Sequence, residues 1–127
     1  MQEQHLFEYA VIRVVPKVER EEFMNVGVIL YCKKQRYLQA RIHLNEGRLQ
    51  TFAPALDLAE ITAYLEALLR ITHGQKEGGP IAILDAAARF RWLTAVRSTV
   101  VQTSRIHPGF CAHLEDKLAK LLLDYCG

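Results

Sequence analysis

The pattern of hydrophobic and polar positions predicts three strands in the first third of the chain. Residues 9–15 (YAVIRVV) are rich in β-branched side chains and apolar on both alternating faces, which predicts a central strand covered on both sides. Residues 25–32 (NVGVILYC) predict a second strand, and residues 33–36 turn the chain into a third at residues 37–44. The third strand is predicted to be half-exposed, because one alternating set is apolar (Leu38, Ala40, Ile42, Leu44) and the other is polar (Tyr37, Gln39, Arg41, His43).

A helical period replaces this alternation in the middle of the chain. Residues 45–54 (NEGRLQTFAP) predict a polar connection. Apolar residues then recur at helical spacing between Asp57, a capping residue, and Gly74, a stop signal. We therefore predict a helix from Asp57 to near His73, with its apolar positions three or four residues apart (Leu58, Ile61, Leu65, Leu68).

The last third of the chain predicts two more helices and one strand. A glycine-rich loop at residues 74–80 (GQKEGGP) precedes an alanine-rich, helix-forming stretch that extends to about Leu93. Residues 98–104 (STVVQTS) predict a fourth strand, and residues 105–110 (RIHPGF) predict a turn. An amphipathic helix follows, whose apolar face holds four leucines and a tyrosine (Leu114, Leu118, Leu121, Leu122, Tyr125).

Strands and helices are segregated in this order rather than alternating. We therefore predict the α+β class: a mostly antiparallel or mixed sheet of about four strands, with two or three helices packed on one face. The 127 residues suffice for a single globular domain that spans residues 1–127. Because 50% of the residues are hydrophobic and 24% are charged, the composition excludes the disordered and fibrous classes.

The balance of charge argues against nucleic acid as a partner. The 16 Lys and Arg residues are interspersed with 14 Asp and Glu residues, whereas a phosphate-binding surface needs several uncompensated cations on one face. Lys33, Lys34 and Arg36 come nearest to such a cluster, but charges in a hairpin turn are usually only solvated. Nucleic-acid binding through these residues and Trp92 is therefore the weakest hypothesis.

The cysteines and the N-terminal residues indicate in which cellular compartment the chain is expected. The three cysteines (Cys32, Cys111, Cys126) match no disulfide framework and no Cys-x-x-Cys metal site, and free thiols suggest a reducing compartment. The first ten residues hold no basic segment followed by an apolar run, and no stretch reaches the roughly 20 apolar residues of a membrane span. We expect a cytoplasmic chain without a membrane segment.

One candidate for ligand chemistry lies in the first two predicted strands. An unpaired guanidinium in a central strand costs several kcal/mol, so Arg13 needs a carboxylate, a set of carbonyl groups or an anionic ligand. Glu21 and Glu22 are the structural candidates for that partner. Asn25 and Gly27 mark either a strand entry with a bulge or a close approach, or the floor of a ligand site that Arg13 reaches.

A second polar group follows the third predicted helix. Arg97 and Ser98 suit an anionic group, and His107 can move a proton near neutral pH, although a polar strand entrance explains the same residues. The spacing of the His and Cys side chains matches no known zinc site, so we predict no metal and no cofactor (Cys32, His107, Cys111, His113). The chain also lacks a nucleophile elbow, a P-loop and a dinucleotide-binding motif.

Two stretches carry a resemblance to a known family. They are YAVIRVVPKVEREEFMNVGVILYC at residues 9–32 and RFRWLTAVRSTVVQTSRIHPGFC at residues 89–111. Their order, with a short final helix, resembles the bacterial family called domain of unknown function 3037 over nearly the whole chain. Val96 and Arg105 stand where the family pattern has proline. The pattern itself falls on three continuous segments and three further positions (Ile12-Arg13, Glu22 to Val28, Arg97-Ser98; Gln102, Ser104, His107).

The resemblance implies a partner but assigns no activity. Such proteins are often encoded beside HipA-type kinases, a toxin–antitoxin context, which implies a HipA-like kinase as protein partner. Our first hypothesis is a non-catalytic interaction or regulatory module that uses Tyr37, Arg41 and His43 on the sheet face. The second is an enzyme or ligand sensor for a small anionic group (Arg13, Asn25, Gly27, Arg97, Ser98, His107). Homodimerisation through an open sheet edge is compatible with either.

Overall fold

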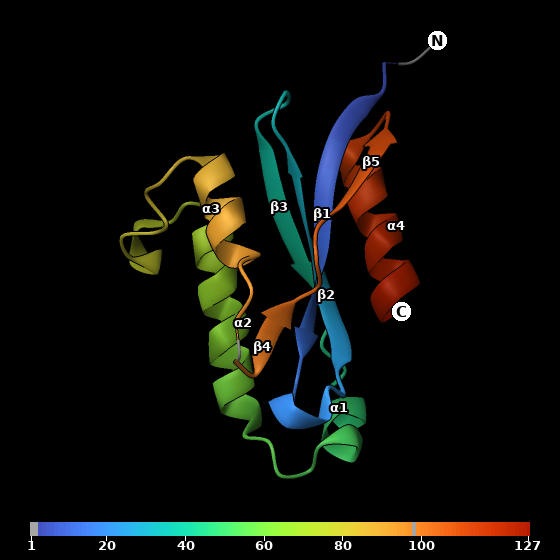
Figure 1. Ribbon diagram of the computed structural model, residues 1–127, viewed down its shortest axis with the longest axis vertical. Coiled ribbons are helices and arrows are strands. Elements are labelled where there is room, and N and C mark those ends of the chain that lie inside the picture. Colours follow the sequence, from blue (N-terminus) through green and yellow to red (C-terminus); the bar gives the residue numbers. More distant parts are fainter. Residues whose placement is uncertain (1–2, 98) are drawn as a thin grey trace.

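The described residues, 3–97 and 99–127 of a computed structural model, form a five-stranded antiparallel sheet and four α-helices (Figure 1). The strands run in the order β3-β2-β1-β4, and β5 also pairs with β1 (β1 His5–Val14, β2 Met24–Cys32, β3 Tyr37–Ile42, β4 Val101–Thr103, β5 His107–Cys111). The helices follow the first three strands and the last one (α1 Glu46–Phe52, α2 Leu58–Thr72, α3 Ala86–Leu93, α4 Leu114–Cys126). The predicted α+β class is confirmed.

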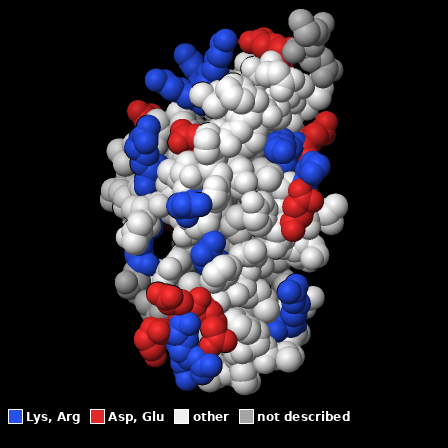
Figure 2. Space-filling view, turned by 45° about the vertical axis from the view of Figure 1, so that its right-hand side comes forward, with Lys and Arg blue, Asp and Glu red and all other residues white. Residues whose placement is uncertain are grey.

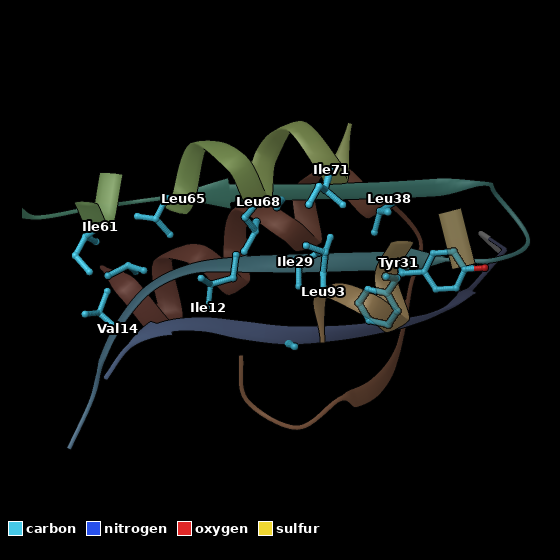
Figure 3. Close-up of a cluster of buried hydrophobic side chains, with 14 of the residues drawn as sticks. Ile12, Val14, Ile29, Tyr31, Leu38, Ile61, Leu65, Leu68, Ile71 and Leu93 are labelled. Carbon is cyan, nitrogen blue, oxygen red and sulfur yellow. The ribbon is translucent and has the colours of Figure 1, made fainter. Parts of the chain in front are cut away.

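Helices cover both faces of the sheet. On one face, α2 and α3 pack on β1 and β2, and Figure 3 shows Ile61, Leu65, Leu68 and Ile71 pointing from α2 toward the strands. On the other face, Phe7 and the second alternating set of β2 pack against α4 (Val28, Leu30, Cys32 with Leu118, Leu121). The predicted placement of all helices on one face was therefore wrong. The reason lies in the apolar character of β1 and β2 on both sides, which requires two covering layers.

Local capping signals set most helix boundaries. Asp57 caps α2 by accepting hydrogen bonds from the backbone N–H groups of Ala59 and Glu60, so this helix lies as predicted. Helix α1, in contrast, occupies part of the predicted polar connection. Asn45 caps it by accepting from the Arg48 N–H. This seven-residue helix buries only Leu49, so it has no apolar period that the sequence could reveal.

The predicted turn at residues 105–110 is wrong, because most of it forms β5. Ile12 faces Thr103 and Tyr9 faces His107, so the edge of β1 pairs first with β4 and then with β5. Between these pairings Arg105 and Ile106 oppose Ala10 alone, which is a β-bulge. Pro108 and Gly109 look like turn residues in the sequence, but proline is tolerated in an edge strand.

Ser104 completes the sheet at this bulge. Its backbone N–H donates to the Val11 carbonyl, and its side-chain Oγ accepts from the Val11 N–H, both at 2.8 Å. The same hydroxyl donates to the Arg105 carbonyl at 2.9 Å. A buried serine hydroxyl thus takes the place of a ladder carbonyl in the middle of the sheet.

We expect Ser104→Ala to lower the free energy of unfolding by about 1–3 kcal/mol, because it leaves the buried Val11 N–H without an acceptor. Urea denaturation followed by circular dichroism measures the change. Thr99→Ala is the matched control: it removes an exposed hydroxyl bond in the same segment and should change stability by less than about 0.5 kcal/mol. Equal stability of the two variants would contradict this role for Ser104.

A second β-bulge, in β2, determines where Asn25, Val26 and Gly27 lie. Ile12 faces Gly27 but Arg13 faces Asn25, so Val26 is an extra residue in β2. The bulge places Val26 in the core under α2 and turns Asn25 toward α4, where its Nδ2 donates to the Tyr125 carbonyl. A Cβ at Gly27 would lie 2.6 Å from the Arg41 carbonyl oxygen. The space beside Gly27 is thus filled by protein atoms.

Candidate functional site

The predicted ligand-binding residues lie in different places. Arg13 and Asn25 are cross-strand neighbours on the α4 side of the sheet. Arg97 lies on the opposite side, where it lines a groove with residues of α2 and α3. Ser98 lies outside the described residues. The structure therefore brings Arg13 and Asn25 together but does not bring Arg97 to them.

Arg13 is a partly buried cation without a carboxylate partner among the described residues. Its guanidinium stacks 3.9 Å above the centre of the Phe23 ring, while its Nε is buried and has no hydrogen-bond partner in the described structure. Burial lowers the pKa of Arg13. Of the two glutamates considered as partners, Glu22 pairs instead with Arg20 at 2.5 Å. The guanidinium therefore keeps donors that an anion could use.

Asn25 ties β2 to the end of α4 and leaves one acceptor unused. Its Nδ2 donates to the Tyr125 carbonyl at 3.2 Å, and its buried Oδ1 has no partner in the part of the chain that is described. The donors of Arg13 and the acceptor of Asn25 lie on directly opposed residues of β1 and β2.

His107 belongs to an aromatic cluster rather than to the Arg13 site. Its ring lies 5.3 Å from that of Tyr9, and the hydroxyls of Tyr9 and Tyr125 are 3.0 Å apart. Burial and the hydrogen bond with Tyr125 raise the pKa of Tyr9 to about 12. Tyr9 precedes Arg13 by four positions along β1, a distance of about 13 Å between their Cα atoms. His107 is therefore too far away to transfer a proton to a group held by Arg13.

Two of the three predicted partner-binding residues, Tyr37 and Arg41 of β3, contact α4. The Tyr37 hydroxyl donates to Glu115 at 2.6 Å, and Arg41 forms an ion pair with the same carboxylate at 2.7 Å. Burial, followed by the hydrogen bond to Glu115, raises the pKa of Tyr37. His43 is exposed beyond them. Two of the three side chains therefore hold α4 in place within the chain.

A groove between α2, β4 and the end of α3 forms a largely apolar recess. It encloses about 220 Å³. Three elements line it: one stripe of α2, the segment that leaves α3, and all of β4 (Tyr64, Ala67, Leu68, Ile71; Trp92, Leu93, Ala95, Arg97, Thr99; Val101, Gln102, Thr103). Tyr64 and Trp92 are 50% and 40% exposed. Half-exposed aromatic rings around an apolar recess are typical of protein-binding surfaces.

Arg97 adds a positive charge to this groove. Its guanidinium lies 4.0 Å from the centre of the Trp92 ring and donates a hydrogen bond to the Trp92 carbonyl. Stacking of this kind holds a guanidinium in one orientation while its remaining N–H groups stay available. The groove thus combines an apolar wall with one fixed cation.

The thiols and the metal-ligating side chains show no reactive arrangement among the described residues. Burial raises the pKa of Cys111, and raises that of Cys126 to about 11, so neither thiol is activated as a nucleophile at neutral pH. No group of three or more His, Cys, Asp and Glu side chains in residues 3–97 and 99–127 is placed to hold a metal ion. Within the same residues, no helix combines the length and the apolar character that crossing a membrane requires.

Charges of both signs are spread over the surface. Figure 2 shows one face on which separate basic side chains lie among uncharged atoms in the middle, while acidic side chains lie mostly toward its ends and right edge. At the hairpin between β2 and β3, Lys34 forms an exposed ion pair with Glu3 at 3.5 Å. On this face, the described residues form no continuous basic track for a phosphate backbone.

Comparison with known proteins assigns the family. A family model described as "Protein of unknown function (DUF3037)" matches residues 9–126. The chain belongs to the DUF3037 family. The match includes α2, α3 and β4, so the groove lies within the DUF3037 domain. No curated protein and no solved structure matches the chain.

The sequence did not reveal the groove. The sequence pattern pointed to Trp92 and Arg97 as single residues, but not to Tyr64. One signal was available: Tyr64 widens the apolar stripe of α2 beyond Ile61, Leu65 and Leu68, which already suffice to cover the sheet.

Proposed function

We propose that this DUF3037 protein is a non-catalytic protein-interaction module that binds its partner through the groove between α2, α3 and β4. One observation carries the proposal: Tyr64 and Trp92 stand half-exposed around an apolar recess of about 220 Å³. Tyrosine, tryptophan and arginine dominate the binding energy of protein interfaces, and the groove holds one of each. A structural role alone would not require these rings to remain in water.

The resemblance described above suggests which partner to test first. We propose a HipA-like kinase in the bacterial cytoplasm, in the toxin–antitoxin context that the resemblance implies. Tyr37 and Arg41 are less suitable contacts than the groove, because they hold Glu115 of α4. His43 is free to extend an interface at the far end of β3.

Purification of the tagged chain from its host, with mass spectrometry and light scattering of the eluate, tests this function. We expect a second protein in stoichiometric amount, and a kinase would identify the partner class. A chain that elutes alone as a monomer would contradict the interaction module. A complex of two copies of this chain would indicate homodimerisation through an open sheet edge in place of a separate protein partner.

A second candidate function rests on Arg13, whose guanidinium has no carboxylate partner in the described residues. In this second function, the protein is a sensor of a small anion that binds to Arg13 and Asn25. We expect inorganic phosphate or a small dicarboxylate to raise the Tm of the wild type and to leave that of Arg13→Gln unchanged. Arg97→Gln is the control and should retain the response. An equal rise in wild type and Arg13→Gln would contradict an Arg13 site.

A further inference from the structure

We infer that the groove takes an extended peptide segment of the partner, which pairs with β4 as an additional strand. This inference rests on the proposed function and specifies the partner's chemistry. The segment is extended, presents apolar side chains at alternate positions, and carries an acidic group toward Arg97. Three features of β4 and its surroundings lead to this assignment.

The first feature is the open hydrogen-bonding edge of β4, which among the described residues pairs only with β1. Val15 donates to the Val100 carbonyl and Ser104 donates to the Val11 carbonyl, which fixes the phase of the ladder. In an antiparallel pair the residues between such positions alternate, so Val101 and Thr103 direct their backbone groups away from β1. The Val101 carbonyl accepts from the Thr99 hydroxyl. Within residues 3–97 and 99–127, the Val101 N–H and both backbone groups of Thr103 have no partner, so they remain for an added strand.

The second feature is the protection of the neighbouring β5. β5 continues the same edge past the bulge, and Pro108 faces Glu8 of β1 in the middle of it. Proline has no N–H to offer, and prolines on edge strands are a common way of preventing further pairing. β4 contains neither proline nor a charged residue. Strand addition on this edge is therefore confined to the three residues beside the groove.

The third feature is the wall that faces this edge. Tyr64, Leu68 and Ile71 lie at helical spacing along α2 and form one side of the groove, while β4 forms the other. Side chains of a strand alternate between its two faces, so every second side chain of an added strand would enter the space against α2. Main-chain hydrogen bonds then supply affinity and the recess selects side chains, as in other cases of β-strand addition.

Arg97 determines the charge of the preferred peptide. It lines the same groove, its guanidinium is held against Trp92, and no carboxylate in the described residues pairs with it. A carboxylate of the peptide would form a charge-assisted hydrogen bond with this fixed cation. A peptide with a basic residue at that position would be repelled.

Selection from a phage-displayed library of random linear peptides, with the full chain as target, tests the inference. Enriched peptides should alternate apolar and polar residues and contain Asp or Glu. They should bind Thr103→Pro at least about tenfold more weakly than wild type, because the substitution removes an outward N–H and none that pairs with β1. Thr103→Ala keeps the N–H and is the matched control, with affinity within about threefold of wild type.

N-methylation of the selected peptides provides a test that does not alter the protein. Methyl groups on one alternating set of peptide nitrogens should abolish binding, while methyl groups on the other set should leave it unchanged, because only one set faces β4. Any of three results would overturn strand addition: binding that tolerates methylation of both sets of nitrogens equally, unchanged binding by Thr103→Pro, or a selection that enriches no peptide. If the co-purified partner is still captured in that case, the interaction module holds and only this mode of binding fails.

Discussion

Gly27→Ala is expected to lower the free energy of unfolding by about 1–3 kcal/mol, and Gly27→Val by more. A Cβ at this position would lie 2.6 Å from the Arg41 carbonyl oxygen and 2.8 Å from the Ile42 Cδ1. Neither atom can move away easily, because the hydrogen bonds between β3 and β2 fix the Arg41 carbonyl and because Ile42 packs against the core. Urea denaturation monitored by circular dichroism gives the difference in stability.

Gly47→Ala is the matched control for this effect. Gly47 lies inside α1, and the nearest atom to its added Cβ would be the Asn45 Oδ1 at 3.8 Å. Alanine favours a helix by up to about 1 kcal/mol over glycine, so this variant should be as stable as the wild type or more stable. A Gly27→Ala variant with the stability of the wild type would show that the β2 bulge has room for a side chain, and would reopen Gly27 as the floor of a ligand site.

Trp92→Ala is expected to weaken binding of the protein partner by about 2 kcal/mol or more, a loss of roughly 30-fold in affinity. The ring contributes apolar area to the groove and also holds the Arg97 guanidinium in place, so its removal disturbs both parts of the surface. Tyr64→Ala should act in the same direction. Calorimetric titration of the purified partner into each variant measures the change.

Phe110→Ala controls for a general effect of removing an exposed aromatic ring. Phe110 is 67% exposed on β5 and does not line the groove. Its replacement should leave partner affinity unchanged, and all three variants should keep the Tm of the wild type within a few degrees. If Phe110→Ala is the only variant that loses affinity for the partner, the interface lies at the β5 edge and not at the groove.

The sequence predicted the elements whose signals are local. β1 and β2 are apolar on both faces, and α2 carries both a capping aspartate and a regular apolar stripe. β2 and α2 therefore lie where the pattern placed them, whereas β1 begins at His5, four residues before its predicted start. β5 was misjudged because Pro108 and Gly109 are turn residues in isolation, whereas their strand conformation depends on pairing with β1, about 100 residues earlier. Helix α4 was predicted correctly but assigned to the wrong face, since an amphipathic pattern does not say which surface it covers.

Candidate sites depend even more on tertiary packing. The sequence showed that Arg13 would be partly buried, but not that Phe23 rather than a glutamate would contact it. The register shift in β2 sets which residues face Arg13, and no local pattern encodes that shift. The groove joins α2 to β4, elements whose residues are separated by some 30 positions. Only the folded chain brings the two together.

Parallel purification of the tagged wild type and the Tyr64→Ala/Trp92→Ala double variant from the host tests the central claim most directly. We predict that a stoichiometric protein partner elutes with the wild type and is absent from the double variant, although both are folded. A partner retained equally by both would contradict the groove as the binding surface. The absence of any partner from the wild type would contradict the interaction module itself.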